Sequence, residues 1–172
     1  MADIFVTSDT HFHHENIIKY CNRPFKNAYE MDEVLVENWN KVIKPLDKVY
    51  HLGDVFIHSN PRKDFLKRLN GKKRLIVGNH DDIKNPELHR YFQKIYLWRV
   101  FKEFNMVLTH VPLHRDSFRK VDYNVHGHTH ANGSPSEEYR CVCVELTNYT
   151  PVHIEEVVRR RYGLDKLPEK EI

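Results

Sequence analysis

The sequence predicts an α/β fold in which parallel strands alternate with helices through the first half of the chain. Short runs rich in apolar and β-branched residues at 3–8, 47–52 and 72–77 are separated by segments with the 3.6-residue apolar period of packing helices. This alternation favours parallel pairing with right-handed crossovers. The second half is richer in short strands. Without a linker or an internal repeat, residues 1–172 are expected to form a single domain.

The helices expected in the first half have recognisable boundaries. A short helix is predicted around residues 17–20. Asn27 is predicted to cap a longer helix, which cannot continue beyond Pro45. A third helix is predicted to open at Asn60–Pro61 and to end at Gly71.

The second half is expected to begin with a helix over residues 86–92 and to end with a helix over residues 155–162. Between them, runs of β-branched and aromatic residues predict strands, of which the first two are close enough to pair with each other. The expected strands cover residues 95–100, 104–109, 122–125, 140–145 and 151–154.

The composition is that of a globular protein and excludes several function classes. Hydrophobic residues make up 40% and charged residues 30%, and the apolar runs are too short to cross a bilayer, so no membrane partner is expected. The N-terminus lacks the basic and apolar regions of a leader, and three cysteines are too few for a disulfide framework. A cytoplasmic location is therefore expected. The net charge of +3 suits a phosphate-bearing substrate but is modest for a protein that coats nucleic acid.

Histidine is unusually frequent, with 13 residues, and several histidines follow predicted strands directly. The run at 72–77 is followed by Gly78 and then by four polar residues, and similar clusters follow four other strands. In open α/β sheets, the carboxyl ends of the strands form the edge at which ligands bind. The ligand-type residues at these positions are Asp9, His11, Asp54, Asn79, His110, His128 and His130.

These seven side chains predict a site for two metal ions. Two carboxylates, one amide and four imidazoles, with no thiolate, suit borderline or moderately hard ions. Seven ligands exceed the four that one zinc ion takes, but they suit two ions that share a carboxylate. Asp54 is the candidate for this shared carboxylate because Gly53 lets the backbone approach a ligand closely. Mn²⁺ is the first choice, with Ni, Fe, Zn or Co as alternatives.

Five motifs occur in order along the chain: Asp9-Thr10-His11, Gly53-Asp54, Gly78-Asn79-His80-Asp81, His110 and Gly127-His128-Thr129-His130. Together they resemble the calcineurin-like metallophosphoesterase superfamily, in its small single-domain bacterial and phage form. The resemblance implies a four-layer α-β-β-α sandwich of two mixed sheets flanked by helices. It also implies the ligand sets, which are Asp9, His11 and His130 for the first ion, Asn79, His110 and His128 for the second, and Asp54 as the bridge.

The expected function is a metal-dependent phosphodiesterase or phosphatase acting on nucleotide-like or other small organic phosphates. Two ions would lower the pKa of a shared water, so that the bridging hydroxide attacks phosphorus in line. The resemblance places His80 over the departing oxygen as a proton donor, with Asp81 beside it to raise its basicity and fix its tautomer. Arg23, His13 and His14 are candidates for substrate contacts, with a structural role as the slightly favoured alternative for each.

Two other functions are compatible with these motifs. A nuclease acting on RNA or DNA would use the same chemistry, but nucleases of this superfamily usually carry an additional domain, for which 172 residues leave no room. A non-catalytic protein-interaction module would use the same fold, as the related retromer subunit does. Such a module is expected to lose a ligand or His80, and this chain keeps them. A nucleic-acid partner is thus not favoured, and either a monomer or a homodimer is compatible with the sequence.

Overall fold

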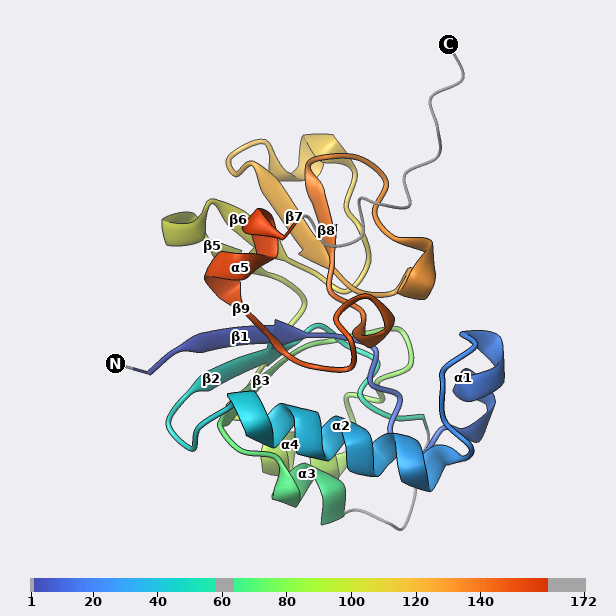
Figure 1. Ribbon diagram of the computed structural model, residues 1–172. Helices are drawn as coiled ribbons and strands as arrows, with labels where there is room; N and C mark the ends of the chain where they lie inside the picture. Colours follow the sequence, from blue (N-terminus) through green and yellow to red (C-terminus); the bar gives the residue numbers. More distant parts are fainter. Residues whose placement is uncertain (1, 58–63, 161–172) are drawn as a thin grey trace.

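Two mixed β-sheets form the centre of the protein in the computed structural model, which describes residues 2–57 and 64–160 (Figure 1). The strand order is β4-β3-β2-β1-β9 in the first sheet and β5-β6-β7-β8 in the second. The strands of the first sheet are β1 (Ile4–Thr7), β2 (Lys48–His51), β3 (Lys72–Ile76), β4 (Lys94–Tyr96) and β9 (Val152–His153). Those of the second are β5 (Arg99–Phe101), β6 (Met106–Leu108), β7 (Tyr123–His126) and β8 (Tyr139–Cys141).

The first sheet contains the parallel pairing that the sequence predicts. β1 pairs with β2, β2 with β3 and β3 with β4 in parallel, whereas β9 is antiparallel to β1. Helices α2 (Ala28–Val42), α3 (Asp64–Arg68) and α4 (Pro86–Tyr91) pack on its outer face, around one apolar core cluster (Figure 1). Asn27 caps α2 as predicted, because its side chain accepts a hydrogen bond from the amide of Glu30.

A second apolar cluster joins the two sheets. It includes Val6, Tyr50 and Ile76 from the first sheet and Met106, Leu108 and Val125 from the second. Helix α5 (Ile154–Arg159), which follows β9, adds Ile154 and Val157 to the same cluster. Burial of these side chains between the sheets fixes the sheets relative to each other, so loops from both can form one site.

A loop with a short 3₁₀ helix, η2 (Arg115–Phe118), covers the outer face of the second sheet. Phe118 and Val121 of this segment pack on Val107 and Tyr139 of the strands. The predicted fold class is thus confirmed, although the fourth layer is this 3₁₀ segment and its loop. The remaining described helical segments are α1 (Glu15–Tyr20), η1 (Lys102–Phe104), η3 (His130–Asn132) and η4 (Val144–Leu146). None of the described helices has the length and apolar character that a membrane span requires.

Two strand predictions are wrong in their extent. Residues 95–100 form two strands, because β4 lies in the first sheet and β5 in the second, and the chain crosses between them at Leu97 and Trp98. Both side chains are exposed, although the run has the composition of one buried strand. The strand predicted over residues 140–145 ends at Cys141. The helix start predicted at Asn60–Pro61 and the last two residues of the predicted final helix lie outside the described residues.

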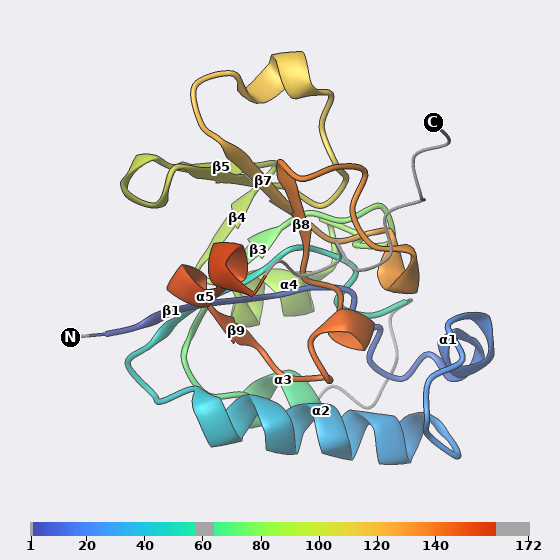
Figure 2. The same ribbon diagram turned by 45° about the horizontal axis from the view of Figure 1, so that its top comes forward.

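The two sheets are joined at the edge where the candidate ligands are found. Ser8, directly after β1, forms an isolated parallel bridge with Cys143, which follows β8. The amide of Val144 donates a hydrogen bond to the carbonyl of Ser8 at 3.2 Å. The loops that follow the strands of the two sheets therefore face one another across this junction (Figure 2).

His51, at the end of β2, makes the fold sensitive to acid. Its side chain is buried, and Nε2 lies 2.9 Å from Oγ1 of Thr10. Burial lowers the pKa of His51 from 6.5 to about 3. The folded protein therefore keeps the imidazole neutral at a pH where the unfolded chain protonates it. We expect the free energy of unfolding to fall as the pH decreases from about 6.5 toward about 3, with about 2 kcal/mol of the loss at pH 5 due to His51.

Urea unfolding of the metal-free protein at pH 7.5 and pH 5 measures this loss. The variant His51→Gln should lose less stability between the two pH values than the wild type, because its side chain does not titrate. His114→Gln, at a histidine whose side chain is 80% exposed, should keep the wild-type pH dependence. An unchanged pH dependence in His51→Gln would contradict the assignment.

Candidate metal centre

The loops at the sheet edge hold five candidate ligands in a strained backbone conformation. The backbone angle φ is 57° at Asp9, 49° at His11, 56° at Asp54, 68° at His128 and 49° at His130. Residues other than glycine rarely occupy this left-handed region, which costs on the order of 1–3 kcal/mol each. Such residues persist only where their surroundings hold them, and they cluster at functional sites.

Glycines allow these loops to come into contact. A Cβ atom on Gly127 would lie 2.3 Å from Oδ2 of Asp9, and one on Gly78 would lie 2.3 Å from Oδ1 of Asp54. Gly53 has a φ of +93°, and a Cβ atom there would lie 2.6 Å from Cα of Gly78. Any larger residue would push the loops apart, so the close packing of the site depends on glycine at these three positions.

Asp9, His11 and His130 converge as one ligand group. Their ligand atoms all lie within 4.8 Å of one another. Oδ1 of Asp9 is 3.9 Å from Nε2 of His11 and 3.7 Å from Nε2 of His130. Oδ1 of Asp9 and both ring nitrogens of His11 are buried and have no hydrogen-bond partner among the described residues. Because an unpartnered buried carboxylate oxygen is costly, a cation fits this set of donors.

The pKa values of the two imidazoles in this group are shifted in opposite directions. Burial and neighbouring positive charges lower the pKa of His11 to about 2, so its ring is neutral and keeps a lone pair for a metal. Burial would also lower the pKa of His130, but hydrogen bonds to Cys21 and Glu145 and the charge of Asp9 raise it to about 10. The surroundings of His130 therefore favour a positive charge. A divalent cation would supply this charge in place of the proton on the imidazole.

The second ligand group consists of Asp54, His110 and His128, whose ligand atoms also lie within 4.8 Å of one another. Oδ1 of Asn79 joins them, 2.8 Å from Nε2 of His110 and 2.9 Å from Nδ1 of His128. Nδ1 of His110 lies 2.7 Å from the carbonyl oxygen of Leu52, to which it donates its proton. In a neutral imidazole, Nε2 of His110 is then an acceptor, and it faces Oδ1 of Asn79, which is also an acceptor. A cation between them would bind both atoms.

Asp54 lies between the two ligand groups. Its Oδ2 is 3.6 Å from Nε2 of His11 in the first group, and its Oδ1 is 3.5 Å from Nε2 of His110 in the second. The amide of His80 donates a hydrogen bond to Oδ1 at 2.9 Å and helps to fix the carboxylate. One oxygen facing each group is the arrangement that a bridging carboxylate requires.

Glu145 supports the first group, although sequence reasoning did not single it out. Its Oε1 accepts hydrogen bonds from Nδ1 of His130 at 3.0 Å and from Nη2 of Arg23 at 2.7 Å. This contact fixes the tautomer of His130 with Nε2 directed toward Asp9, as carboxylates behind metal-binding histidines commonly do. The signal for Glu145 in the sequence is its place at the end of the predicted strand 140–145, where other strands carry their ligands.

Three donors, two of them also missed by sequence reasoning, fix the other oxygen of Asp9. Its Oδ2 accepts hydrogen bonds from the hydroxyl of Ser8, from the thiol of Cys143 at 3.2 Å and from the amide of His128 at 2.9 Å. The carboxylate is thereby oriented with Oδ1 toward His11. The bond from His128 also ties the loop that carries Asp9 to the loop that carries His128 and His130.

The role expected of Asp81 is corrected by the structure. Its Oδ2 accepts hydrogen bonds from the amides of Gly78 at 2.8 Å and Asp54 at 2.9 Å, and its Oδ1 accepts one from Val55 at 2.9 Å. Burial raises the pKa of Asp81, although these bonds oppose the rise. Asp81 therefore ties the loop after β3 to the loop after β2, rather than fixing the imidazole of His80.

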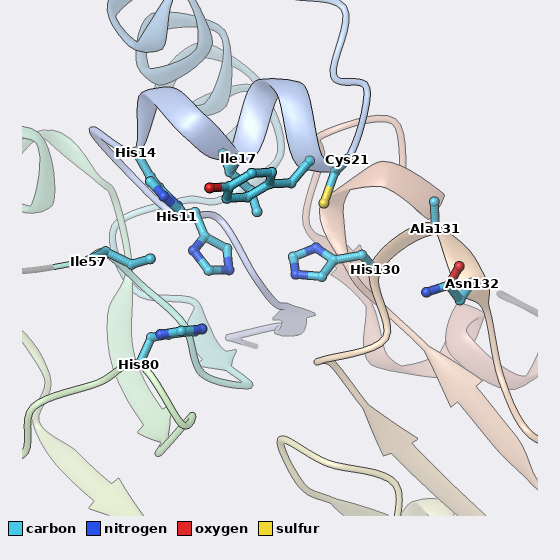
Figure 3. A pocket seen from close by; sticks show the side chains of 10 residues that line it. His11, His14, Ile17, Cys21, Ile57, His80, His130, Ala131 and Asn132 are labelled. Carbon is cyan, nitrogen blue, oxygen red and sulfur yellow. The ribbon is translucent and has the colours of Figure 1, made fainter.

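His80 has an exposed side chain next to the first ligand group. Its ring centroid is 5.7 Å from that of His11, and the two rings meet edge to face. Figure 3 shows His80 directed into a cavity that His11 and His130 also line. A substrate beside the ligand groups would therefore meet this imidazole.

The three candidate substrate contacts have different placements. Arg23 is buried, and it donates to the carbonyls of Asp9 at 2.7 Å and Thr10 at 2.8 Å and to Glu145, so a phosphate contact does not fit and its role is structural. Nδ1 of His13 contacts the buried carboxylate of Asp32, and His13 is not among the described residues that line the cavity, so the structural alternative is favoured for it too. His14 does line the cavity and stays a candidate (Figure 3).

Comparisons with known proteins cover most of the chain. Residues 2–145 match the family model described as the calcineurin-like phosphoesterase superfamily domain. An uncharacterised protein of Methanocaldococcus jannaschii is 38% identical over 172 aligned residues, which cover 92% of this chain and 91% of that protein. The gene 66 protein of Mycobacterium phage L5 is 30% identical over 131 residues, which cover 71% of this chain and 61% of that protein. A crystal structure of a protein of unknown function from Aquifex aeolicus is 30% identical, with a TM-score of 0.75, and the match covers 93% of this chain and 100% of that one.

Proposed function

Because the chain belongs to the calcineurin-like phosphoesterase superfamily, we propose that it binds two divalent ions and hydrolyses a small phosphodiester or phosphomonoester. The membership confirms the resemblance predicted from the motifs, and it makes the chain a metal-dependent phosphoric ester hydrolase. Mn²⁺ is the proposed ion, with Ni, Fe, Zn or Co as alternatives. The placement of Asp54, with one carboxylate oxygen facing each ligand group, is the observation that carries the two-ion proposal.

The proposed ligands are those that the motifs predict. Asp54 would contact both ions. The first ion would be held by Asp9, His11 and His130, and the second by Asn79, His110 and His128. The unpartnered Oδ1 of Asp9 and the convergence of acceptors on Asn79 support this assignment.

The chain's own residues would orient the site and move the proton of the leaving group. When bound, the ions would supply Lewis-acid chemistry, which activates water near neutral pH and neutralises phosphoryl oxygens. Glu145 and the Leu52 carbonyl would hold His130 and His110 in the tautomers that direct Nε2 toward the ions. His80 would donate a proton to the departing alkoxide, since it is exposed in the cavity.

A cytoplasmic location is also part of the proposal. Cys21, Cys141 and Cys143 are all free thiols, although the sulfur atoms of Cys141 and Cys143 lie only 3.4 Å apart. Unpaired thiols at this distance suit a reducing compartment.

Metal reconstitution tests the proposed function. The metal-stripped protein should hydrolyse bis-p-nitrophenyl phosphate or p-nitrophenyl phosphate only after Mn²⁺ is added, and elemental analysis should find two ions per chain. The ratio of the two rates would show whether diesters or monoesters are preferred. Two bound ions without turnover of either ester would overturn the proposal and favour the protein-interaction module, and turnover in the presence of a strong chelator would exclude the metal mechanism.

Removing the negative charge of Glu145 should weaken binding of the first ion. We expect Glu145→Gln to lower the affinity for Mn²⁺ at one of the two sites by about 10- to 100-fold, because the amide fixes His130 less firmly and reduces its basicity. Titration of the apoprotein in a metal buffer measures both affinities. Glu33→Gln is a matched control, since Glu33 also pairs with an arginine, Arg68, but on the surface. Equal Mn²⁺ affinities in Glu145→Gln and the wild type would contradict this role.

A further inference from the structure

The cavity beside the candidate metal centre is lined by both imidazoles and apolar side chains. Its volume is about 680 Å³, within the range of about 300–1,000 Å³ that small-molecule sites occupy. His11, His80 and His130 are the imidazoles next to the ligand groups. Ile17, Tyr20 and Ile57 add apolar surface to the same lining. A substrate whose phosphate lies at the metals would therefore place its organic part against this apolar surface.

Helix α1 provides most of the apolar surface and is held firmly in place. Ile17 is only 4% exposed and belongs to the core cluster of the first sheet, which anchors the helix. Arg23, just after the helix, is hydrogen-bonded to the backbone of the loop that carries Asp9 and to Glu145. These contacts fix the distance between α1 and the first ligand group. The apolar wall is thus a rigid part of the site.

Tyr20, the last residue of α1, is the exposed part of this wall. Its side chain is 75% exposed although it lines the cavity. Its ring lies nearly perpendicular to that of His14, with centroids 6.2 Å apart, so this contact covers at most one of its two faces. An exposed aromatic ring beside a polar site is a surface on which a flat group of a ligand can stack.

The charges of the lining limit what this ligand can be. Among the described residues that line the cavity there is no Lys, Arg, Asp or Glu. A second phosphate or a polynucleotide backbone would therefore meet no Lys or Arg side chain among these described residues. Asn132, in contrast, offers an uncharged amide that can bind a sugar hydroxyl or the edge of a heterocycle.

We propose that Tyr20 and the adjoining face of α1 bind a flat aromatic or heteroaromatic ring of the substrate, so that the enzyme acts on esters resembling a single nucleotide. The inference rests on the proposed function, because the phosphate must lie at the metal centre for its ring to reach α1. The ring would stack on Tyr20, and Asn132 and His14 would contact the polar groups between the ring and the phosphate.

Equilibrium binding to the Mn²⁺-loaded protein tests this inference without turnover when the ligands are phosphonates, in which a methylene group replaces the ester oxygen. The phosphonate analogues of adenosine 5′-monophosphate and of ribose 5-phosphate share a sugar and a phosphonate and differ in the base. Calorimetry should find the adenosine analogue bound about tenfold more tightly, as expected for one stacked base. Tyr20→Ala should remove this ratio, and Tyr20→Phe should restore it. Tyr29→Ala, at a tyrosine that is 65% exposed on α2 outside the cavity lining, should keep the wild-type ratio.

Equal affinities for the two ligands in the wild type, undetectable binding of both, or an unchanged ratio in Tyr20→Ala would overturn the inference. Its failure is distinguishable from failure of the proposed function. If bis-p-nitrophenyl phosphate is hydrolysed but the base makes no difference to binding, only the ring site is wrong. If the base strengthens binding but no ester is hydrolysed, the ring site stands and the hydrolase assignment fails.

Discussion

Replacing Asp54 by asparagine is expected to lower kcat by roughly 10³-fold at saturating Mn²⁺, because several kcal/mol of charge stabilisation depend on both ions being held together. The two oxygens of Asp54 face His11 and His110 at 3.6 and 3.5 Å. An amide has only one oxygen and no charge, so one of the two contacts would be lost. Elemental analysis should then find fewer than two ions per chain.

The measurement requires a control for stability, because Asp54 is buried. Asp47→Asn changes another buried aspartate, which accepts hydrogen bonds from the amides of Asp3 and Lys44 at the opposite end of β2. Asp47→Asn should lose stability in urea without losing metal stoichiometry, whereas Asp54→Asn should lose stoichiometry and kcat. If Asp54→Asn kept two ions and the wild-type kcat, Asp54 would not be the bridge.

The placement of the candidate ligands could be predicted from the sequence because strand ends are a local feature. A run such as 72–77 followed by Gly78 and polar residues can be recognised from neighbouring residues alone. Parallel pairing then brings the ends of separate strands to one edge, and this follows from topology alone. The structure indeed brings Asp9, His11 and His130 together, and Asp54 with His110.

The supporting contacts could not be predicted because they join residues far apart in the chain. Arg23 and Glu145 are separated by 122 positions, and an arginine in a loop gives no sign that it will be buried. Asp81 was expected to act on its neighbour His80, but its oxygens contact backbone amides, one of them on Val55. The candidate metal ligands can be recognised from the local sequence. The residues that fix these ligands in place cannot, because their contacts depend on the packing of both sheets.

The second large effect is expected at His80 and should depend on the leaving group. His80→Ala should lower kcat/KM for an alkyl phosphate ester by about 10²- to 10⁴-fold, the usual contribution of a general acid. The same variant should lose much less activity toward a p-nitrophenyl ester, because p-nitrophenolate is stable enough to depart without a proton. Steady-state rates of both esters with Mn²⁺ measure this difference, and His114→Ala, at an exposed histidine, is the matched control.

The dependence on the leaving group separates proton donation from other roles of His80. If its imidazole mainly bound the phosphate, both esters would lose activity by the same factor, since both carry the phosphate. If it mainly supported the loop through its amide, which donates to Asp54, the alanine variant would keep that bond and lose little with either ester. Full activity of His80→Ala on the alkyl ester would therefore remove the general-acid role. A loss confined to that ester would show that the exposed imidazole beside His11 supplies the proton.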